Sequence, residues 1–135
     1  MMRALYFVYM DIAERLKSAM RGEISIADED RKAASRDTSL FLRMPAVVAF
    51  PKDADDVSRA VRTGSDAKKE GADVAIAARA AGTDMSGGPL TDSVVLSLTR
   101  HLNRVDDLAA SPDGTSGTIW NEPGVYYRDF EKASV

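Results

Sequence analysis

Cysteine is absent from this 135-residue chain, and histidine occurs once, as His101. Without cysteine the chain forms no disulfide, has no thiolate nucleophile and supplies no ligand to an iron–sulfur cluster. One histidine cannot build a multi-histidine metal site unless several chains share it, so we predict no metal site. We interpret His101 as a surface residue. Because no pair of carboxylates has a spacing that acid–base chemistry requires, we assign no catalytic residue.

Long hydrophobic runs are also missing. No stretch approaches the roughly 18 apolar residues that a membrane-spanning helix needs. The short apolar run of residues 1–10 is interrupted by Asp11 and lacks the cleavage site of a signal peptide. We therefore expect a cytoplasmic protein with no transmembrane segment, and leave open a peripheral association of its parent protein with a membrane. Lys and Arg total 18 against 21 Asp and Glu, so no basic stripe points to nucleic acid.

The overall composition, with 44% hydrophobic and 29% charged residues, is typical of one globular domain. An amphipathic helix is predicted from about Ala4 to Met20, with Gly22 as its stop, and we interpret it as a helix that packs on a core. Its apolar face consists of Leu5, Val8, Ile12, Leu16 and Met20. Residues 1–21 form this helix, and residues 22–135 form the domain proper.

The middle of the chain alternates strands with helices. Strands are predicted at Glu23–Ile26, Ala46–Phe50, Val74–Ala77, Val94–Leu98 and Thr118–Asn121. The second and third of these are apolar throughout, which is typical of strands buried on both faces. Asp28–Lys32 is expected to be a solvated turn, and a further helix begins near Tyr126.

Asp53 is a good N-cap for a helix that follows the second strand and ends at Gly71, and Asp56 holds a capping-box position three residues later. Strand, helix and strand with a short return predict a βαβ unit with parallel strands. The predicted fold class is therefore α/β, a small parallel βαβ sheet flanked by helices.

The segment Arg79–Leu90, RAAGTDMSGGPL, directly follows a predicted strand and is small, polar and rich in glycine. Glycine lets successive backbone N–H groups line one concavity, and such a nest binds anions, most often phosphate. Open α/β sheets also bind ligands at the ends of strands. The segment is neither a Walker A loop nor a GxGxxG fingerprint. On composition alone, a phosphate-binding loop and a structural turn both remain open.

The order of these motifs resembles the FAD-binding domain of the vanillyl-alcohol oxidase, or PCMH, type, in its glycolate oxidase and D-lactate dehydrogenase branch. The resemblance runs from about Gly22 onward. It is carried by the following motifs, in this order: Asp37–Phe41 before Pro45, Val47–Pro51 with Asp55–Val57, Arg79–Gly88, Val94–Leu98 with Asn103–Val105, and Pro123–Val125.

The resemblance implies that the loop wraps the FAD pyrophosphate with its backbone amides. The positions implied as cofactor-binding are Arg79, Ala80, Ala81, Gly82, Thr83, Asp84, Ser86, Gly87 and Gly88, together with Pro123 and Gly124. Ala80 stands where the family commonly has glycine, which requires a negative φ at this residue. Covalent members commonly carry a histidine about where Thr83 stands, so the resemblance implies non-covalent FAD.

The resemblance further implies a flavin-dependent parent enzyme that oxidises a 2-hydroxy acid, such as lactate or glycolate, by hydride transfer to FAD. It implies that residues 22–135 are the first portion of the FAD domain, incomplete at the C-terminus, so we expect this chain alone to be inactive. Two alternatives stay open: a non-catalytic nucleotide- or phosphate-binding module, and an interaction module. In the latter, exposed strand edges and apolar surface would favour self-association.

Overall fold

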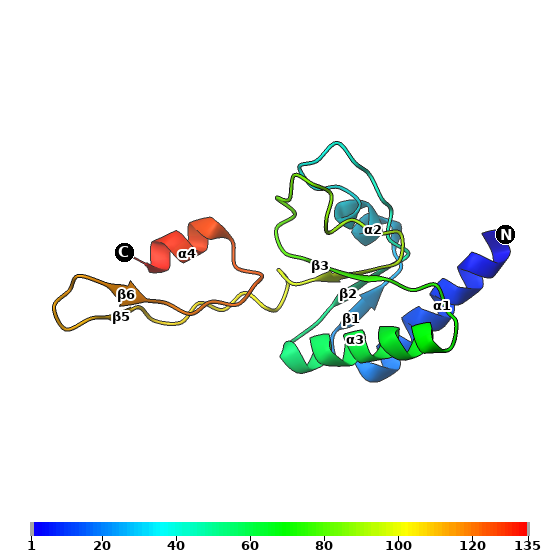
Figure 1. The fold of residues 1–135 in the computed structure, drawn as a ribbon, viewed down its shortest axis with the longest axis horizontal. Helices are drawn as coiled ribbons and strands as arrows, with labels where there is room; N and C mark the ends of the chain where they lie inside the picture. The colour runs from blue at the N-terminus through cyan, green and yellow to red at the C-terminus, as the bar shows by residue number, and fades with distance from the viewer. Residues whose placement is uncertain (1, 135) are drawn as a thin grey trace.

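A four-stranded sheet forms the centre of the main body (Figure 1). This computed structural model describes residues 2–134, and the sheet places β1 (Glu23–Ser25), β2 (Val47–Phe50), β4 (Val94–Ser97) and β3 (Ile76–Arg79) side by side in that order. β2 and β3 both run parallel to β4, whereas β1 is antiparallel to β2. The predicted parallel strands are confirmed, and β4 lies between the two that the helix connects.

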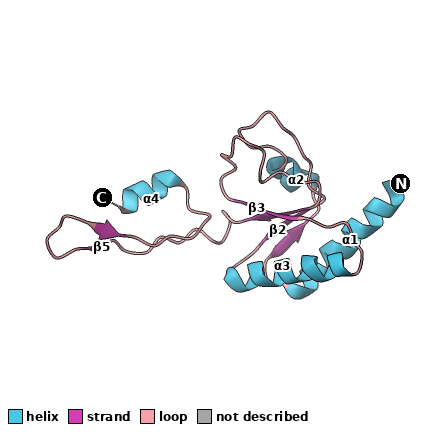
Figure 2. Ribbon diagram, viewed as in Figure 1, coloured by secondary structure: helices cyan, strands magenta, loops and turns pink. Residues whose placement is uncertain are grey.

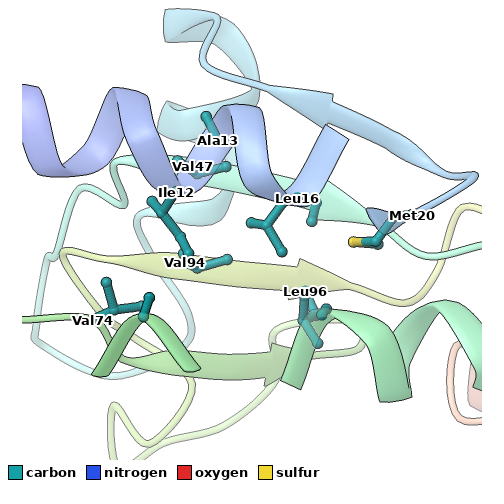
Figure 3. Packing of buried hydrophobic residues seen from close by; sticks show 11 residues of the cluster. Ile12, Ala13, Leu16, Met20, Val47, Val74, Val94 and Leu96 are labelled. Atoms are coloured by element: carbon teal, nitrogen blue, oxygen red, sulfur yellow. The ribbon is translucent and has the colours of Figure 1, made fainter. Parts of the chain in front are cut away.

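Helices cover both faces of the sheet (Figure 2). α1 (Met2–Ala19) and α3 (Ala54–Lys69) pack on one face, and α2 (Asp28–Ala34) packs on the other. Side chains alternate along each strand, so the two faces have separate apolar clusters. The larger cluster includes Ile12, Leu16, Met20, Val47, Val94 and Leu96 (Figure 3). The smaller one consists of Ala34, Val48, Phe50 and Val95. The prediction that β2 is buried on both faces is confirmed.

The N-terminal helix packs on the core, as predicted, through its buried Ile12 and Leu16, and the buried Met20 follows directly after its end. Leu5 and Val8, expected on the same face, lie outside the side chains that the structure describes. The helix ends at Ala19, so Gly22 is not its cap. Gly22 instead permits a close approach, because a Cβ there would collide with the carbonyl oxygen of Phe50. Within residues 2–134, no helix is both long and apolar enough to cross a membrane.

Two predicted elements differ in the structure. The charged run 28–32 begins the short helix α2 rather than a turn, because its acidic residues lie in the first turn and its basic residues in the last, which matches the helix dipole. The third strand begins at Ile76, two residues later than predicted, and its side chains are half-buried. This shallow burial follows from the position of β3 at the edge of the sheet, where only β4 pairs with it.

The chain leaves the sheet after β4 and forms an arm that projects from the main body (Figure 1). The arm holds a hairpin of β5 (Ala109–Ala110) and β6 (Gly117–Thr118), followed by α4 (Tyr127–Ala133). The predicted strand 118–121 is thus reduced to the end of β6 and one isolated bridge between Val105 and Asn121. No third strand supports this two-stranded ribbon among residues 2–134, and a lone hairpin has little to pack against.

A buried carboxylate joins the start of α3 to the segments beside it. Asp53 caps the helix as predicted, its Oδ1 accepting from the N–H of Asp56 at 3.0 Å. The side chain of Asp56 is fully buried, and its oxygens bond to Arg21, Gly22 and Lys52 instead of the Asp53 N–H that the predicted capping box requires. Its Oδ1 accepts from Arg21 N–H at 3.0 Å, and its Oδ2 accepts from the N–H groups of Gly22 at 2.9 Å and Lys52 at 3.1 Å. The carboxylate therefore ties the end of α1 to the connection between β2 and α3.

Burial alone would raise the pKa of Asp56, but the hydrogen bonds from the backbone N–H groups of Arg21, Lys52 and Gly22 outweigh it, and the pKa lies below its usual value. A carboxyl group whose pKa is lowered by folding stabilises the fold above its unfolded pKa of about 3.9. That contribution is lost as the pH falls through the lower, folded pKa.

We expect Asp56→Asn to lower the free energy of unfolding by about 2–4 kcal/mol at neutral pH, because an amide nitrogen would face buried backbone donors. Urea unfolding measures this loss. Repeating the measurement near pH 3, below the unfolded pKa of about 3.9, should show a smaller difference from the wild type, because the unfolded wild-type chain then binds a proton that folding must release.

Asp55→Asn is the matched control, because Asp55 lies in the same first turn of α3 and is exposed. We expect this variant to change the free energy of unfolding by less than about 0.5 kcal/mol. Equal unfolding midpoints for the two variants would show that the buried carboxylate does not hold these segments together.

Candidate functional site

The predicted loop begins at the carboxyl end of β3, where Arg79 is the last residue of the strand. A cavity of about 590 Å³ opens beside it, a size typical of small-molecule sites. The cavity is lined by Ile76, Ala77, Ala78, Arg79, Ala80, Ala81, Gly82, Thr83, Asp84, Gly88 and Pro89. Seven of the eleven residues predicted to bind the cofactor therefore share one cavity wall: Arg79, Ala80, Ala81, Gly82, Thr83, Asp84 and Gly88.

The first half of the loop carries unpaired backbone donors. Within the part of the chain that the structure describes, the N–H groups of residues 80–83 donate to no protein acceptor. Gly82 has a φ of +73°, in the left-handed region that glycine adopts without strain. Ala80 has a negative φ, so its methyl group is compatible with the loop conformation, as the sequence required. Consecutive free N–H groups around a left-handed residue form a nest that suits an anion.

The second half of the loop is held by its own carboxylate. Oδ1 of Asp84 accepts from Ser86 N–H and Ser86 Oγ, both at 2.7 Å, and from Gly88 N–H at 3.2 Å. The bond from Ser86 Oγ, with those from the two backbone groups, keeps the pKa of Asp84 below its usual value. Ser86 and Gly88 thus use their donors inside the loop, whereas the N–H groups of residues 80–83 remain open to a ligand.

A second segment, not proposed from the sequence as part of the site, fixes the loop from outside. Thr38 donates its backbone N–H to Asp84 O at 3.1 Å, and its Oγ1 lies 2.9 Å from the same oxygen and 3.1 Å from Thr83 O. The ring of Phe41 packs so closely on Gly87 that a Cβ there would lie 2.8 Å from Cδ2. Gly87, with a φ of +80°, therefore serves the packing of Phe41.

The turn 123–125 lies at a different place from the loop cavity. Gly124 is buried and donates its N–H to Leu102 O at 2.7 Å, and a Cβ there would collide with the carbonyl oxygen of Leu98. Pro123 and Gly124 do not line the cavity beside the loop. The turn instead fixes the course of the chain toward Tyr126, which lines a second cavity.

This second cavity, of about 410 Å³, lies on the α2 face at the carboxyl ends of β2 and β4. It shares Arg79, Ala80 and Ala81 with the first cavity. Its remaining lining comes from Asp30, Ala33, Ala34, Val48, Phe50, Ser97, Thr99, Arg100 and Tyr126. Sequence reasoning did not assign these residues to a site, because they come from four separate segments that only the fold brings together.

Charged and aromatic groups shape the rim of the second cavity. The guanidinium of Arg100 lies 3.3 Å from the centre of the Phe50 ring and 3.7 Å from a carboxylate oxygen of Asp30. His101, the next residue, bonds to Glu23 at 2.7 Å, and this bond is the main cause that lowers the pKa of Glu23. His101 lines neither cavity, and its side chain is half-buried beside Glu23.

Similarity to known proteins extends over the loop described above. Residues 45–135 match the FAD binding domain family, which confirms the resemblance found in the sequence. A curated relative, D-2-hydroxyglutarate dehydrogenase of Pseudomonas putida, is 35% identical over 98 residues. The match covers 72% of this chain and 10% of that protein, so the chain spans about a tenth of this relative's length.

Solved structures share the fold. Alkyldihydroxyacetonephosphate synthase superposes with a TM-score of 0.67 at 18% identity, over 92% of this chain and 24% of that one. Glucooligosaccharide oxidase from Acremonium strictum superposes with a TM-score of 0.59 at 20% identity, over 84% of this chain and 22% of that one. Because the family match covers more than half of the chain and includes the whole Arg79–Gly88 loop, this chain belongs to the FAD-binding domain family of flavin-dependent oxidoreductases.

Proposed function

We propose that this chain binds the diphosphate of FAD on the N–H groups of residues 80–83. The observation that carries the proposal is the set of unpartnered donors around the left-handed Gly82, on the wall of a cavity of about 590 Å³. Backbone donors neutralise a phosphate anion without a specific side chain, which suits a loop made of alanine and glycine. The buried guanidinium nitrogen of Arg79 adds positive charge at the same place.

We propose further that the parent protein oxidises a 2-hydroxy acid. The relative from Pseudomonas putida is named for D-2-hydroxyglutarate, a 2-hydroxy acid, and this supports the substrate class expected from the sequence. Bound FAD supplies a hydride acceptor, and the protein contributes binding and orientation. No residue of the two cavities is assigned as an acid or base, so the share of this chain in that activity is to hold the cofactor.

In this proposal FAD is held without a covalent bond. The chain has no cysteine, and its single histidine is engaged with Glu23 and lines neither cavity. Glucooligosaccharide oxidase, a structural neighbour, is described as carrying a 6-S-cysteinyl, 8α-N1-histidyl FAD. Thr83, which stands where covalent members commonly carry histidine, offers only a hydroxyl group.

We expect the purified chain to bind FAD, and Gly82→Ala to weaken this binding by about tenfold or more. A Cβ at residue 82 would lie 2.5 Å from Cζ of Arg79, and a φ of +73° is strained for alanine, so the N–H groups would be displaced. Quenching of flavin fluorescence in a titration measures the affinity. ADP serves as a second ligand, and equal affinity for ADP and FAD would favour the simpler nucleotide- or phosphate-binding module.

Gly114→Ala is the matched control. Gly114 has a φ of +68°, close to that of Gly82, but a Cβ there meets no atom within 4 Å and the residue lies in the distant hairpin turn. Both variants place alanine at a similar positive φ, but only Gly82→Ala should lose affinity for FAD. If FAD binds both variants as tightly as the wild type, the diphosphate does not sit on this loop.

We expect the chain alone, saturated with FAD, to show no oxidation of D-2-hydroxyglutarate, D-lactate or glycolate. The physical reason is that neither cavity presents a group assigned to take a proton from the substrate hydroxyl. Reduction of an electron-accepting dye measures the activity, with free FAD as the blank. Dye reduction above this blank, dependent on one of the hydroxy acids, would show that residues 1–135 contain a working catalytic site.

A further inference from the structure

The side chain of Arg79 turns back beneath its own loop. Arg79 ends β3, and its guanidinium packs against the Cα atom of Gly82, three residues later. The contact is so close that a Cβ on Gly82 would lie 2.5 Å from Cζ and 3.0 Å from Nε of Arg79. The planar guanidinium therefore fills the space that any larger residue at position 82 would need.

One nitrogen of this guanidinium has no partner. Nη1 of Arg79 is buried and forms no hydrogen bond with any residue that the structure describes. A buried cationic donor without an acceptor is unfavourable, so such a group normally meets an anion. The loop carboxylate of Asp84 does not serve this purpose, because its Oδ1 accepts from Ser86 and Gly88.

A second buried atom without a partner lies on the segment tied to the loop. It is Oδ2 of Asp37, next to Thr38, whose backbone and side chain bond to Thr83 and Asp84. Asp37 and Arg79 form no ion pair in the described part of the chain. Within the described part of the chain, Nη1 of Arg79 thus has no partner, and the guanidinium lies against Gly82, inside the segment 80–83 whose N–H groups are free.

We propose that Arg79 is a positioning residue for the anion nest: its guanidinium supports the left-handed turn at Gly82 from beneath, and its uncompensated charge draws the diphosphate to the N–H groups. The inference rests on the proposed function and deepens it, because it names the side chain that shapes a site whose donors are backbone N–H groups. The support of the turn depends on the flat shape of the guanidinium. The attraction of the diphosphate depends only on its positive charge. Lysine would keep the charge and lose the flat contact.

The two roles can be separated with Arg79→Lys and Arg79→Met. The order parameters of the backbone N–H groups of residues 80–84, measured by NMR relaxation without ligand, should be lower in both variants, because both lose the flat contact with Gly82. The affinity for FAD and for inorganic pyrophosphate should fall by the same factor, about 10- to 100-fold, in Arg79→Met and by less in Arg79→Lys. Riboflavin, which has no phosphate, should bind all forms equally.

Arg62→Met is the matched control, since Arg62 is exposed on α3 and lines neither cavity. Addition of guanidinium ion at low millimolar concentration should restore part of the pyrophosphate affinity of Arg79→Met and leave Arg62→Met unchanged. This rescue is not expected if the loss comes from general unfolding, which guanidinium would worsen.

Unchanged order parameters at residues 80–84 in Arg79→Met would overturn the inference, and so would an equal loss of affinity for riboflavin and FAD. Equally low order parameters in Asp37→Asn would assign the support of the loop to the segment of Asp37 rather than to Arg79. If wild-type chain binds neither FAD nor pyrophosphate, the proposed function fails, while the order parameters still decide whether Arg79 supports the loop.

Discussion

The rest of the structure depends on the buried carboxylate of Asp56. It accepts hydrogen bonds from the N–H groups of Arg21 and Gly22, between α1 and β1, and of Lys52, between β2 and α3. With these groups joined at one point, α1 and α3 are held together on one face of the sheet. The carboxyl ends of the parallel strands and the other face then remain available for ligand, and both cavities at the loop lie there.

The two halves of the candidate loop have different roles. Asp84, Ser86 and Gly88 satisfy one another, and Thr38 fixes the carbonyl groups at the middle of the loop. The other half, residues 80–83, makes no such bonds within the described chain. An anion site needs donors that are fixed in place yet unused, and a loop with one self-satisfied half provides the fixed support for the unused donors of the other.

Local patterns were enough to predict β2, the N-cap at Asp53, the packing of α1 and the glycine-rich loop, because each rests on neighbouring residues. The start of β3 and its shallow burial could not be predicted, since they follow from β4 lying between β2 and β3. The helix at 28–34 was not predicted, because a run of charged residues is typical of a solvated turn as well as of a helix. Here the order of the charges matches the helix dipole. Asp56 and Thr38 act on segments far away in the sequence, and no spacing reveals such partners.

The glycines of the loop illustrate why composition alone could not separate a binding site from a turn. Gly87 gives room to the ring of Phe41 and Gly88 donates to Asp84, so both serve the structure of the loop. Gly82 alone combines a left-handed backbone with free N–H groups and a guanidinium packed beneath it. Since the strip 79–81 is the wall common to both cavities, charge at this point suits a ligand whose anionic part lies at its middle. A dinucleotide has that form, with its diphosphate between two larger groups, and this agreement of shape and charge favours FAD over a ligand that carries its phosphate at one end.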